Sequence, residues 1–262
     1  MDVYWLEQSE ADVPAADDWL SESEAVQLSS FRFAKRRADW RLGRWTAKCA
    51  VAASLKLADN HRPLKKIKIS AASTGQPEVT LVESAERVTI SISHRNGIAI
   101  CAVAVGSVKL GCDLEVIEPR SDAFIADYFT AEEGELIAQT SGEKRTLLVS
   151  LLWSAKESAL KALHVGLRAD TRSVGVNPVD SHGHWVAETS ARATDSGSAP
   201  ELSNVSSTYW HRLQVHCADG GDFRGWWQRT GNILRTVVAS PSPALPIELR
   251  IPSETGIIPL IP

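Results

Sequence analysis

The 262-residue chain has no hydrophobic segment long enough to cross a membrane. Its longest uninterrupted apolar run is Ile98–Val105, whereas a membrane-spanning helix needs about 20 apolar residues. The first residues also lack the basic start and apolar block that a secretory signal peptide carries. We therefore expect a protein that neither spans a membrane nor enters the secretory pathway.

Cysteine is scarce and scattered. Cys49, Cys101, Cys112 and Cys217 lie far apart and show no paired spacing. This argues against a disulfide scaffold and against a zinc site built from paired cysteines. We expect buried, reduced thiols in a cytoplasmic protein.

The first 30 residues contain no lysine or arginine. Their eight acids are followed, in residues 31–68, by twelve bases and only two acids, Asp39 and Asp59. A basic segment in a protein of net charge −4 indicates a local anion site and argues against a general nucleic-acid surface. The alternative is a helix face that is simply solvated.

Hydrophobic residues make up 44% of the chain, enough for a core in one large domain or two modest ones. Each half of the sequence predicts helices followed by a hairpin of apolar strands. The fold class expected is α+β, with two similar α/β subdomains (a pseudodimer) and the active site in the cleft between them. We expect an N-terminal subdomain over 1–106, a C-terminal subdomain over 107–240 and a Pro-rich surface tail over 241–262.

Local patterns predict the individual elements. A long amphipathic helix is expected from Phe33 to Leu57, with a polar face carrying Lys35, Arg41, Arg44 and Lys48. Capping boxes at Ser21–Glu24 and Thr130–Glu133 predict two helix starts, and a further helix is expected from Thr146 to about Leu163. Asn96-Gly97 predicts a hairpin turn. Strands are expected at 4–6, 67–69, 88–94, 98–105, 108–116, 173–176, 185–188, 209–216, 225–228 and 233–239, and a loop at 190–206.

Two short motifs supply three carboxylates and two lysines. Gly111-Cys112-Asp113-Leu114-Glu115 reads as a strand, so Asp113 and Glu115 point to the same side. Trp153-Ser154-Ala155-Lys156-Glu157-Ser158-Ala159-Leu160-Lys161 reads as a helix, in which Glu157 and Lys161 share a face. Oxygen ligands of this kind suit Mg²⁺, which often completes its coordination with substrate phosphates. The set therefore indicates phosphate chemistry on an organic diphosphate. Taken alone, Asp113 and Glu115 could be exposed strand residues, and Glu157 and Lys161 could be an ordinary helix ion pair.

The chain resembles the 4′-phosphopantetheinyl transferase superfamily, in particular its large, pseudodimeric Sfp-type members. The resemblance covers roughly residues 30–240 and rests on four pieces in the same order and spacing. They are Ile92-Ser93-His94, Leu110-Gly111-Cys112-Asp113-Leu114-Glu115, Phe129-Thr130 with Glu133, and the segment Trp153–Lys161.

The resemblance implies a holo-carrier-protein synthase. Such an enzyme moves the 4′-phosphopantetheine group of coenzyme A onto a serine of an apo acyl or peptidyl carrier protein and releases 3′,5′-ADP. It further implies that Asp113, Glu115 and Glu157 hold Mg²⁺, that Glu157 is the base for the serine, and that Lys156 and Lys161 hold phosphate oxygens. Ser93 and His94 would lie near the 3′-phosphate of coenzyme A. In the basic helix Lys35 and Arg44 are the expected phosphate contacts, with Arg36, Arg37 and Arg41 as competitors, whereas Trp153 is expected to pack in the core.

The family often has Gly-Lys-Pro where this chain has Gly75-Gln76-Pro77, so a positive charge near the nucleotide is missing. His182-Gly183-His184 is interpreted as a solvated turn and not as a metal pair. The expected partners are coenzyme A and a small acidic carrier protein whose serine lies at a helix N-terminus, with no nucleic acid and no membrane, and the expected state is a monomer. Two other functions stay open: a metal-dependent phosphodiesterase or nuclease, and a non-catalytic carrier-binding module.

Overall fold

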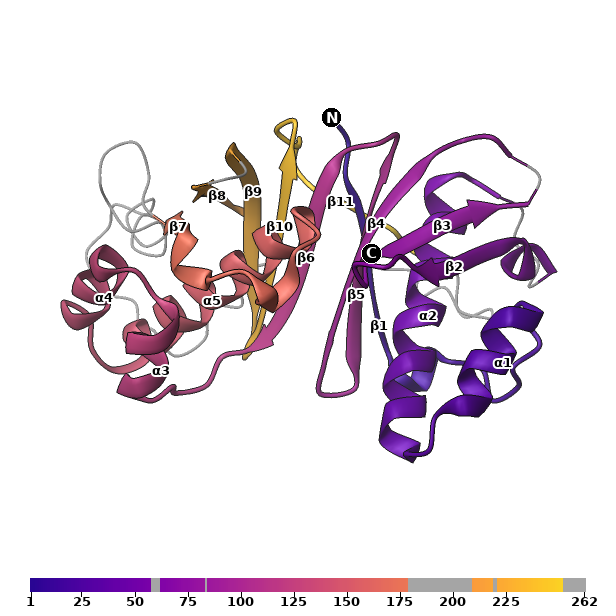
Figure 1. Cartoon of the computed structure of the whole chain (residues 1–262), viewed down its shortest axis with the longest axis horizontal. Helices are drawn as coiled ribbons and strands as arrows, with labels where there is room; N and C mark the ends of the chain where they lie inside the picture. Colours follow the sequence, from indigo (N-terminus) through magenta and orange to yellow (C-terminus); the bar gives the residue numbers. More distant parts are fainter. Residues whose placement is uncertain (58–61, 83, 179–208, 219–220, 252–262) are drawn as a thin grey trace, which may run out of the picture.

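The hairpin of β4 (Val88–Arg95) and β5 (Ile98–Val105) confirms the predicted turn at Asn96 and Gly97. Both residues have positive φ, 54° and 73°, a conformation that asparagine and glycine accept most readily. The computed structural model describes residues 1–57, 62–82, 84–178, 209–218 and 221–251 (Figure 1). The predicted elements at 185–188 and 190–206 and the segment His182–His184 lie outside the described residues.

The N-terminal half forms a sheet in the order β11-β1-β5-β4 and a separate hairpin of β2 and β3. Helix α2 packs on the outer face of the sheet, and α1 lies beside α2 (Figure 1). The elements of this half are β1 (Tyr4–Ser9), α1 (Glu22–Ser30), α2 (Ala34–Ser54), β2 (Ile67–Ala71), β3 (Pro77–Leu81), β4 and β5.

The C-terminal half forms a second sheet in the order β6-β10-β9-β8-β7, and the long helix α5 packs on its outer face. Its elements are β6 (Lys109–Val116), α3 (Asp122–Tyr128), α4 (Ala131–Ala138), α5 (Gly142–Ala162), β7 (Val174–Asn177), β8 (His211–Cys217), β9 (Gly221–Thr230) and β10 (Ile233–Ser240). The expected mixture of helices and strands is therefore confirmed. The short helix α3 and strand β3 had not been predicted.

The inner faces of the two sheets pack against each other. Ile100, Ala102 and Ala104 of β5 meet Leu110 and Leu114 of β6 in a fully buried cluster. The alternate residues of β5, Cys101 and Val103, face α2. Burial on both faces explains why β5 is an uninterrupted apolar run, since a strand with one wet face would alternate.

Strands β4 and β6 lie side by side at the seam between the halves, joined by side chains in place of a backbone ladder. The Cys112 amide donates to Ser91 Oγ at 2.9 Å, and the Cys112 thiol donates to the Ser91 carbonyl at 3.0 Å. On the other side of β6, Gly111 meets α5 so closely that a Cβ there would lie 1.8 Å from the Ser158 carbonyl oxygen. The glycine of the first motif thus lets β6 and α5 approach each other.

The tail was expected to be an extended coil, and part of it is a strand. Strand β11 (Ile247–Glu248) pairs in parallel with β1 of the N-terminal half, and the Ala244 amide donates to the Met1 carbonyl at 2.8 Å. Residues 241–251 therefore return from the second sheet to the first.

All four cysteines are buried and unpaired, as expected. Within the described residues, no helix combines the length and the apolar character that a bilayer crossing requires.

Candidate active site

Asp113 lies at the centre of the candidate site, on β6 beside β4 and α5. Its Oδ1 accepts hydrogen bonds from Ser93 Oγ and from Lys161 Nζ, both at 2.8 Å. The residue is 2% exposed, and its Oδ2 has no hydrogen-bond partner within the described structure. A buried carboxylate oxygen without a donor is costly, and a bound cation or proton would satisfy it.

Glu115 follows two residues later on the same face of β6. The indole Nε1 of Trp153 donates to its Oε1 at 3.2 Å, and Arg120 Nη2 donates to its Oε2 at 3.5 Å. Arg95 Nε lies 3.9 Å from the same Oε2. Burial and the charge of Asp113 raise the pKa of Glu115, while Arg95, Arg120 and Trp153 oppose that rise. Glu115 is thus held by one neutral donor and two cations.

Glu157 projects from α5 toward the two carboxylates of β6. Burial, the charges of Asp113 and Glu115 and a hydrogen bond with Asp113 raise its pKa to about 7, although Lys161 lowers it. A carboxyl group with this pKa can exchange its proton near neutral pH, as a general base requires. The motif on β6 and the motif on α5 therefore meet at one place.

Lys161 compensates part of this negative charge. Its Nζ lies 2.8 Å from Asp113 Oδ1 and 4.0 Å from Glu157 Oε2, and it donates to the Cys112 carbonyl at 3.1 Å. Burial alone would lower the pKa of Lys161, but Asp113, Cys112 and Glu157 outweigh it and raise the pKa. Its ammonium group is therefore charged at neutral pH.

His94 is the last residue but one of β4 and is exposed. Its ring lies against α2, since a Cβ on Gly43 would be 3.9 Å from His94 Cδ2. Partial burial lowers the pKa of His94; Asp39 opposes this, and Lys161, Lys35 and Arg36 lower the pKa further. The charges of Lys161, Lys35 and Arg36 thus act on the imidazole from both halves of the chain, together with the opposing charge of Asp39.

Within the described residues, no three His, Cys, Asp or Glu side chains are arranged closely enough to form a ready metal site. Asp113 is instead paired with Lys161, and Glu115 with Arg120 and Arg95. The donor set still fits a hard divalent cation, because Asp113 Oδ2 is unpartnered and the three carboxylates repel one another. A divalent cation would relieve both features.

Three lysine and arginine predictions are wrong. Lys156 does not reach the site, because it is fully buried, pairs with Glu133 at 2.8 Å and donates to the Thr171 and Val174 carbonyls. Arg44 is also buried and donates to the Ile69 carbonyl at 2.6 Å. Lys48 was also predicted to lie on the polar face of α2, but it is fully buried and pairs with Glu24 at 2.6 Å.

The remaining predicted residues are placed as follows. Ser93 uses its hydroxyl to hold Asp113, and Lys35 is exposed and pairs with Asp39 at 2.7 Å. Arg41 binds Asp17 Oδ1 at 2.8 Å and is committed to the loop before α1. Gln76 lines a cavity of about 600 Å³ together with Thr89, Lys109 and His164.

Three residues of the site had not been predicted: Arg95, Arg120 and the polar role of Trp153. Arg95 directly follows Ser93-His94, and Arg120 lies just beyond β6, but no motif marks either one. Trp153 lies four residues before Glu157, so helix periodicity places both on one face. That spacing was a usable signal for a contact with Glu115.

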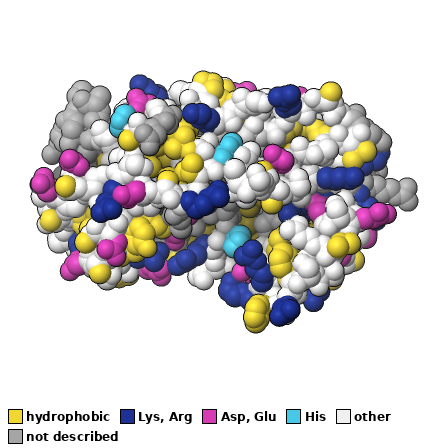
Figure 2. Space-filling model, viewed as in Figure 1, with side chains coloured by type: hydrophobic (Ala, Val, Ile, Leu, Met, Phe, Trp, Pro, Cys, Tyr) yellow, Lys and Arg dark blue, Asp and Glu magenta, His cyan; other side chains and the backbone are white. Residues whose placement is uncertain are grey.

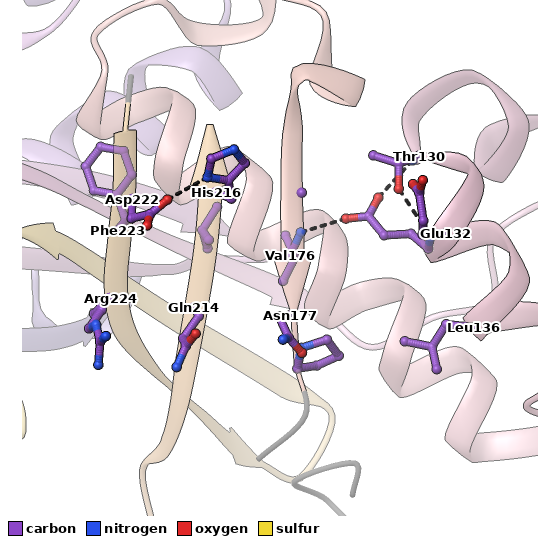
Figure 3. A pocket seen from close by; sticks show the side chains of 14 residues that line it. Thr130, Glu132, Leu136, Val176, Asn177, Gln214, His216, Asp222, Phe223 and Arg224 are labelled. Carbon is purple, nitrogen blue, oxygen red and sulfur yellow. Dashed lines mark hydrogen bonds and ion pairs between the residues drawn. The ribbon is translucent and has the colours of Figure 1, made fainter. Parts of the chain in front are cut away.

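A second cavity, of about 550 Å³, lies away from all of these residues, between α4 and strands β7, β8 and β9 (Figure 3). In it Glu133 accepts from the Val176 and Thr130 amides at 2.9 Å, and His216 Nδ1 contacts Asp222 at 2.5 Å. These polar groups are occupied by one another, so the cavity carries no chemistry that the site needs.

One family model matches part of the chain. Residues 109–218 match the family model described as ACPS, the 4′-phosphopantetheinyl transferase superfamily. This segment contains Asp113, Glu115, Glu157 and Lys161, and the match confirms the superfamily resemblance seen in the sequence. No curated protein matches the chain significantly.

Three solved structures are similar to part of the chain. A Helicobacter pylori holo-[acyl-carrier-protein] synthase in complex with coenzyme A is 22% identical, covers 40% of this chain and 99% of its own, and gives a TM-score of 0.33. A Bacillus anthracis holo-(acyl-carrier-protein) synthase in complex with CoA (3′,5′-ADP) is 18% identical, with coverages of 40% and 96% and a TM-score of 0.36. A Thermotoga maritima holo-[acyl-carrier-protein] synthase is 17% identical, with coverages of 51% and 79% and a TM-score of 0.32.

Proposed function

We propose that this protein is a 4′-phosphopantetheinyl transferase that acts as a holo-carrier-protein synthase. It would transfer the phosphopantetheine arm of coenzyme A to a serine of an apo acyl or peptidyl carrier protein and release 3′,5′-ADP. The observation that carries the proposal is the convergence of Asp113, Glu115, Glu157 and Lys161 beside His94 at the seam between the halves. Acids alone would serve a phosphodiesterase as well, but the segments Ile92-Ser93-His94 and Trp153–Lys161 and the family match over residues 109–218 favour the transferase.

The residues supply most of what the reaction needs. Glu157, with a pKa of about 7, would take the proton of the attacking serine, because a serine hydroxyl is a weak nucleophile until a base acts on it. Lys161 would offset charge on the diphosphate as the bond to the leaving group breaks. Ser93 holds Asp113 in one orientation, so that Oδ2 stays available.

Asp113, Glu115 and Glu157 are the residues that would hold Mg²⁺. When bound, this ion would polarise the diphosphate as a Lewis acid and neutralise its charge. Lys35 and Arg36, exposed cations of α2 whose charges lower the pKa of His94, would hold the 3′-phosphate with the imidazole. Arg44 and Lys156 are buried in ion pairs, so we do not propose them as contacts to the 3′-phosphate.

We also propose that the chain is a pseudodimer of the large Sfp-type, with subdomains 1–106 and 107–240 and a tail over 241–262. The support is a repeated arrangement around Trp45-Thr46-Ala47-Lys48 and Trp153-Ser154-Ala155-Lys156. Both lysines are fully buried, and each pairs with the glutamate of a capping box, Glu24 or Glu133. Each glutamate also accepts from a strand amide, that of Ile69 or Val176.

We propose a monomer with a single catalytic set per chain. Aligning the two motifs places Cys49 where Glu157 stands and Ala53 where Lys161 stands. The N-terminal helix therefore lacks both the base and the phosphate contact. The cytoplasm, where coenzyme A and apo-carriers occur together, is the compartment that we propose.

The experiment that tests the function is incubation with coenzyme A, Mg²⁺ and a panel of apo-acyl and apo-peptidyl carrier proteins, followed by intact-mass measurement. The wild type should add one phosphopantetheine group to at least one carrier and release 3′,5′-ADP. Hydrolysis of coenzyme A without modification of any carrier would instead identify a phosphodiesterase. Carrier binding without any transfer would identify a docking module.

A further inference from the structure

At the N-terminal turn of α2, an apolar side chain is exposed next to exposed arginines. Phe33, at the helix N-cap, is 77% exposed. Arg32, Arg36 and Arg37 are exposed around it, and within the described residues none of the three forms an ion pair. Phe33 and Arg37 share one helix face, because they are four residues apart. We call Arg32, Phe33 and Arg37 the α2 patch.

The α2 patch lies beside the candidate site. His94 packs against α2 at Gly43, and Phe33 lies ten residues earlier, about 15 Å along the helix axis. Figure 2 shows Lys and Arg side chains gathered with hydrophobic ones at the lower end of the right-hand half, next to a hollow between the halves. A small protein that delivers a serine to the site would therefore cover this turn.

Helices α3 and α4 of the other half carry exposed acids, although Asp122 pairs with Arg145 at 2.7 Å. On α3 and α4 the exposed acids are Asp122, Asp127, Glu132 and Glu135. Arg120, the base at the start of this stretch, is paired with Glu115 and Glu118. We expect an acidic partner to be attracted to the α2 patch, where Arg32 and Arg37 are exposed without an ion pair.

We propose that the α2 patch is the docking surface for an acidic carrier protein, with Phe33 as the apolar anchor and Arg32 and Arg37 as contacts to carboxylates beside the acceptor serine. This inference rests on the proposed function. Exposed aromatic and arginine side chains are the residue types that dominate binding energy in protein interfaces. Arg32 and Arg37 form no ion pair within the described residues, whereas Arg36 lies over the Phe31 ring, 5.6 Å from its centroid.

The test compares Phe33→Ala and Arg32→Glu with two matched controls on the same half, Val82→Ala and Arg87→Glu, which alter an exposed valine and an exposed arginine. The assay measures transfer to the carrier that the wild type modifies best. Each patch variant should raise KM for the carrier about tenfold, with KM for coenzyme A unchanged. Arg32→Glu should also flatten the decline of kcat/KM with salt. The controls should behave as the wild type does.

A binding assay keeps docking separate from catalysis. Carrier proteins whose acceptor serine is replaced by alanine are titrated against each variant, so binding is measured without turnover. If the wild type binds these carriers and the patch variants bind about tenfold more weakly, docking is supported even if no transfer is seen. Equal binding by the wild type and both patch variants would overturn the docking surface while leaving transfer intact. A rise in KM for coenzyme A instead would assign the patch to the nucleotide and also overturn the proposal.

Discussion

Lys161 Nζ lies 2.8 Å from Oδ1 of Asp113, while Oδ2 of the same carboxylate has no hydrogen-bond partner within the described structure. One oxygen is thus neutralised by a fixed cation, and the other is left for a ligand. This division of one carboxylate is the basis for the predictions about the site.

Asp113→Asn should abolish transfer. The amide keeps the size of the side chain but presents at most one acceptor oxygen, and it removes the charge opposite Lys161. We expect kcat/KM to fall by at least about 10³-fold, the scale on which single electrostatic groups act in such sites. Intact-mass assays of the carrier give the rate, and isothermal titration with Mg²⁺ in the absence of substrate gives the loss of metal binding. Mg²⁺ binding equal to that of the wild type would contradict the ligand assignment.

Glu157 should make stability depend on pH. Its pKa is raised from 4.5 to about 7 in the folded protein, so the folded state binds the proton more tightly than the unfolded state. Its contribution is therefore full below pH 4.5 and is lost as the pH rises toward 7, by about 3 kcal/mol in total. In EDTA, Glu157→Gln should match the wild type near pH 4.5 and exceed its free energy of unfolding at pH 8.

Urea unfolding at both pH values measures this difference. Adding Mg²⁺ at pH 8 should stabilise the wild type more than Glu157→Gln, since the cation relieves the same repulsion. A difference between the two proteins that stays constant from pH 4.5 to pH 8 would show that Glu157 titrates normally. The same variant should also lose transfer activity, as the role of base requires.

His94→Ala should weaken the use of coenzyme A specifically. We propose that the imidazole, whose pKa is lowered by the charges of Lys161, Lys35 and Arg36, contacts the 3′-phosphate. We expect KM for coenzyme A to rise about tenfold, the scale of one lost hydrogen bond to a charged group, with KM for the carrier unchanged. Steady-state kinetics with 3′-dephospho-coenzyme A provides the control, because the wild type and the variant should then be equal. A tenfold difference that persists with this substrate would place His94 elsewhere.

Lys156→Met should destabilise the fold without a specific effect on coenzyme A. The substitution leaves Glu133 buried without its cation, which costs about 3–5 kcal/mol when one partner of a buried pair is removed. Thermal and urea unfolding measure the loss. Lys156→Met combined with Glu133→Gln should recover part of it, because no unpaired charge remains. If the single variant is as stable as the wild type but has a raised KM for coenzyme A, Lys156 belongs to the site after all.

Gly111→Ala should push β6 away from α5. A Cβ at this position would lie 1.8 Å from the backbone oxygen of Ser158, and neither backbone can yield easily. We expect a loss of at least about 2 kcal/mol and a fall in Mg²⁺ binding, since β6 carries Asp113 and α5 carries Glu157. Gly134→Ala on α4 is the matched control, because a Cβ there meets nothing within 4 Å. Equal stability of the two variants would contradict the close approach.

Much of the fold was predictable from local pattern. The bounds of β5 were predicted correctly, because a strand buried on both faces is a continuous apolar run between turn residues. The capping boxes at Glu24 and Glu133 gave the starts of α1 and α4. The seven residues of α3 were missed, because so short a helix shows too few periods of hydrophobicity to be recognised.

The orientation of charged residues was less predictable. Periodicity counts a lysine as polar, so Lys48 was placed on the outer face of α2. The ion pair with Glu24 offsets the free-energy cost of burying Lys48. Glu24 lies on another helix, so no pattern within α2 indicates this partner. The same holds for Lys156 and Glu133. Comparing the two halves with each other would have exposed both pairs, because the Trp-[Ser/Thr]-Ala-Lys segment occurs in each.

The residues of the candidate site come from both halves of the chain, which meet where β4 lies beside β6. His94 lies on β4 of the first sheet, next to α2. Asp113 and Glu115 lie on β6 of the second sheet, and Glu157 and Lys161 lie on α5. Hydrogen bonds between Ser91 and Cys112 connect β4 with β6. Cleavage of the polypeptide between Val105 and Lys109 would give two fragments, and each would contain only some of the residues of the proposed site. Under the proposed function, neither fragment alone would catalyse transfer, and transfer would return only when the two fragments reassociate.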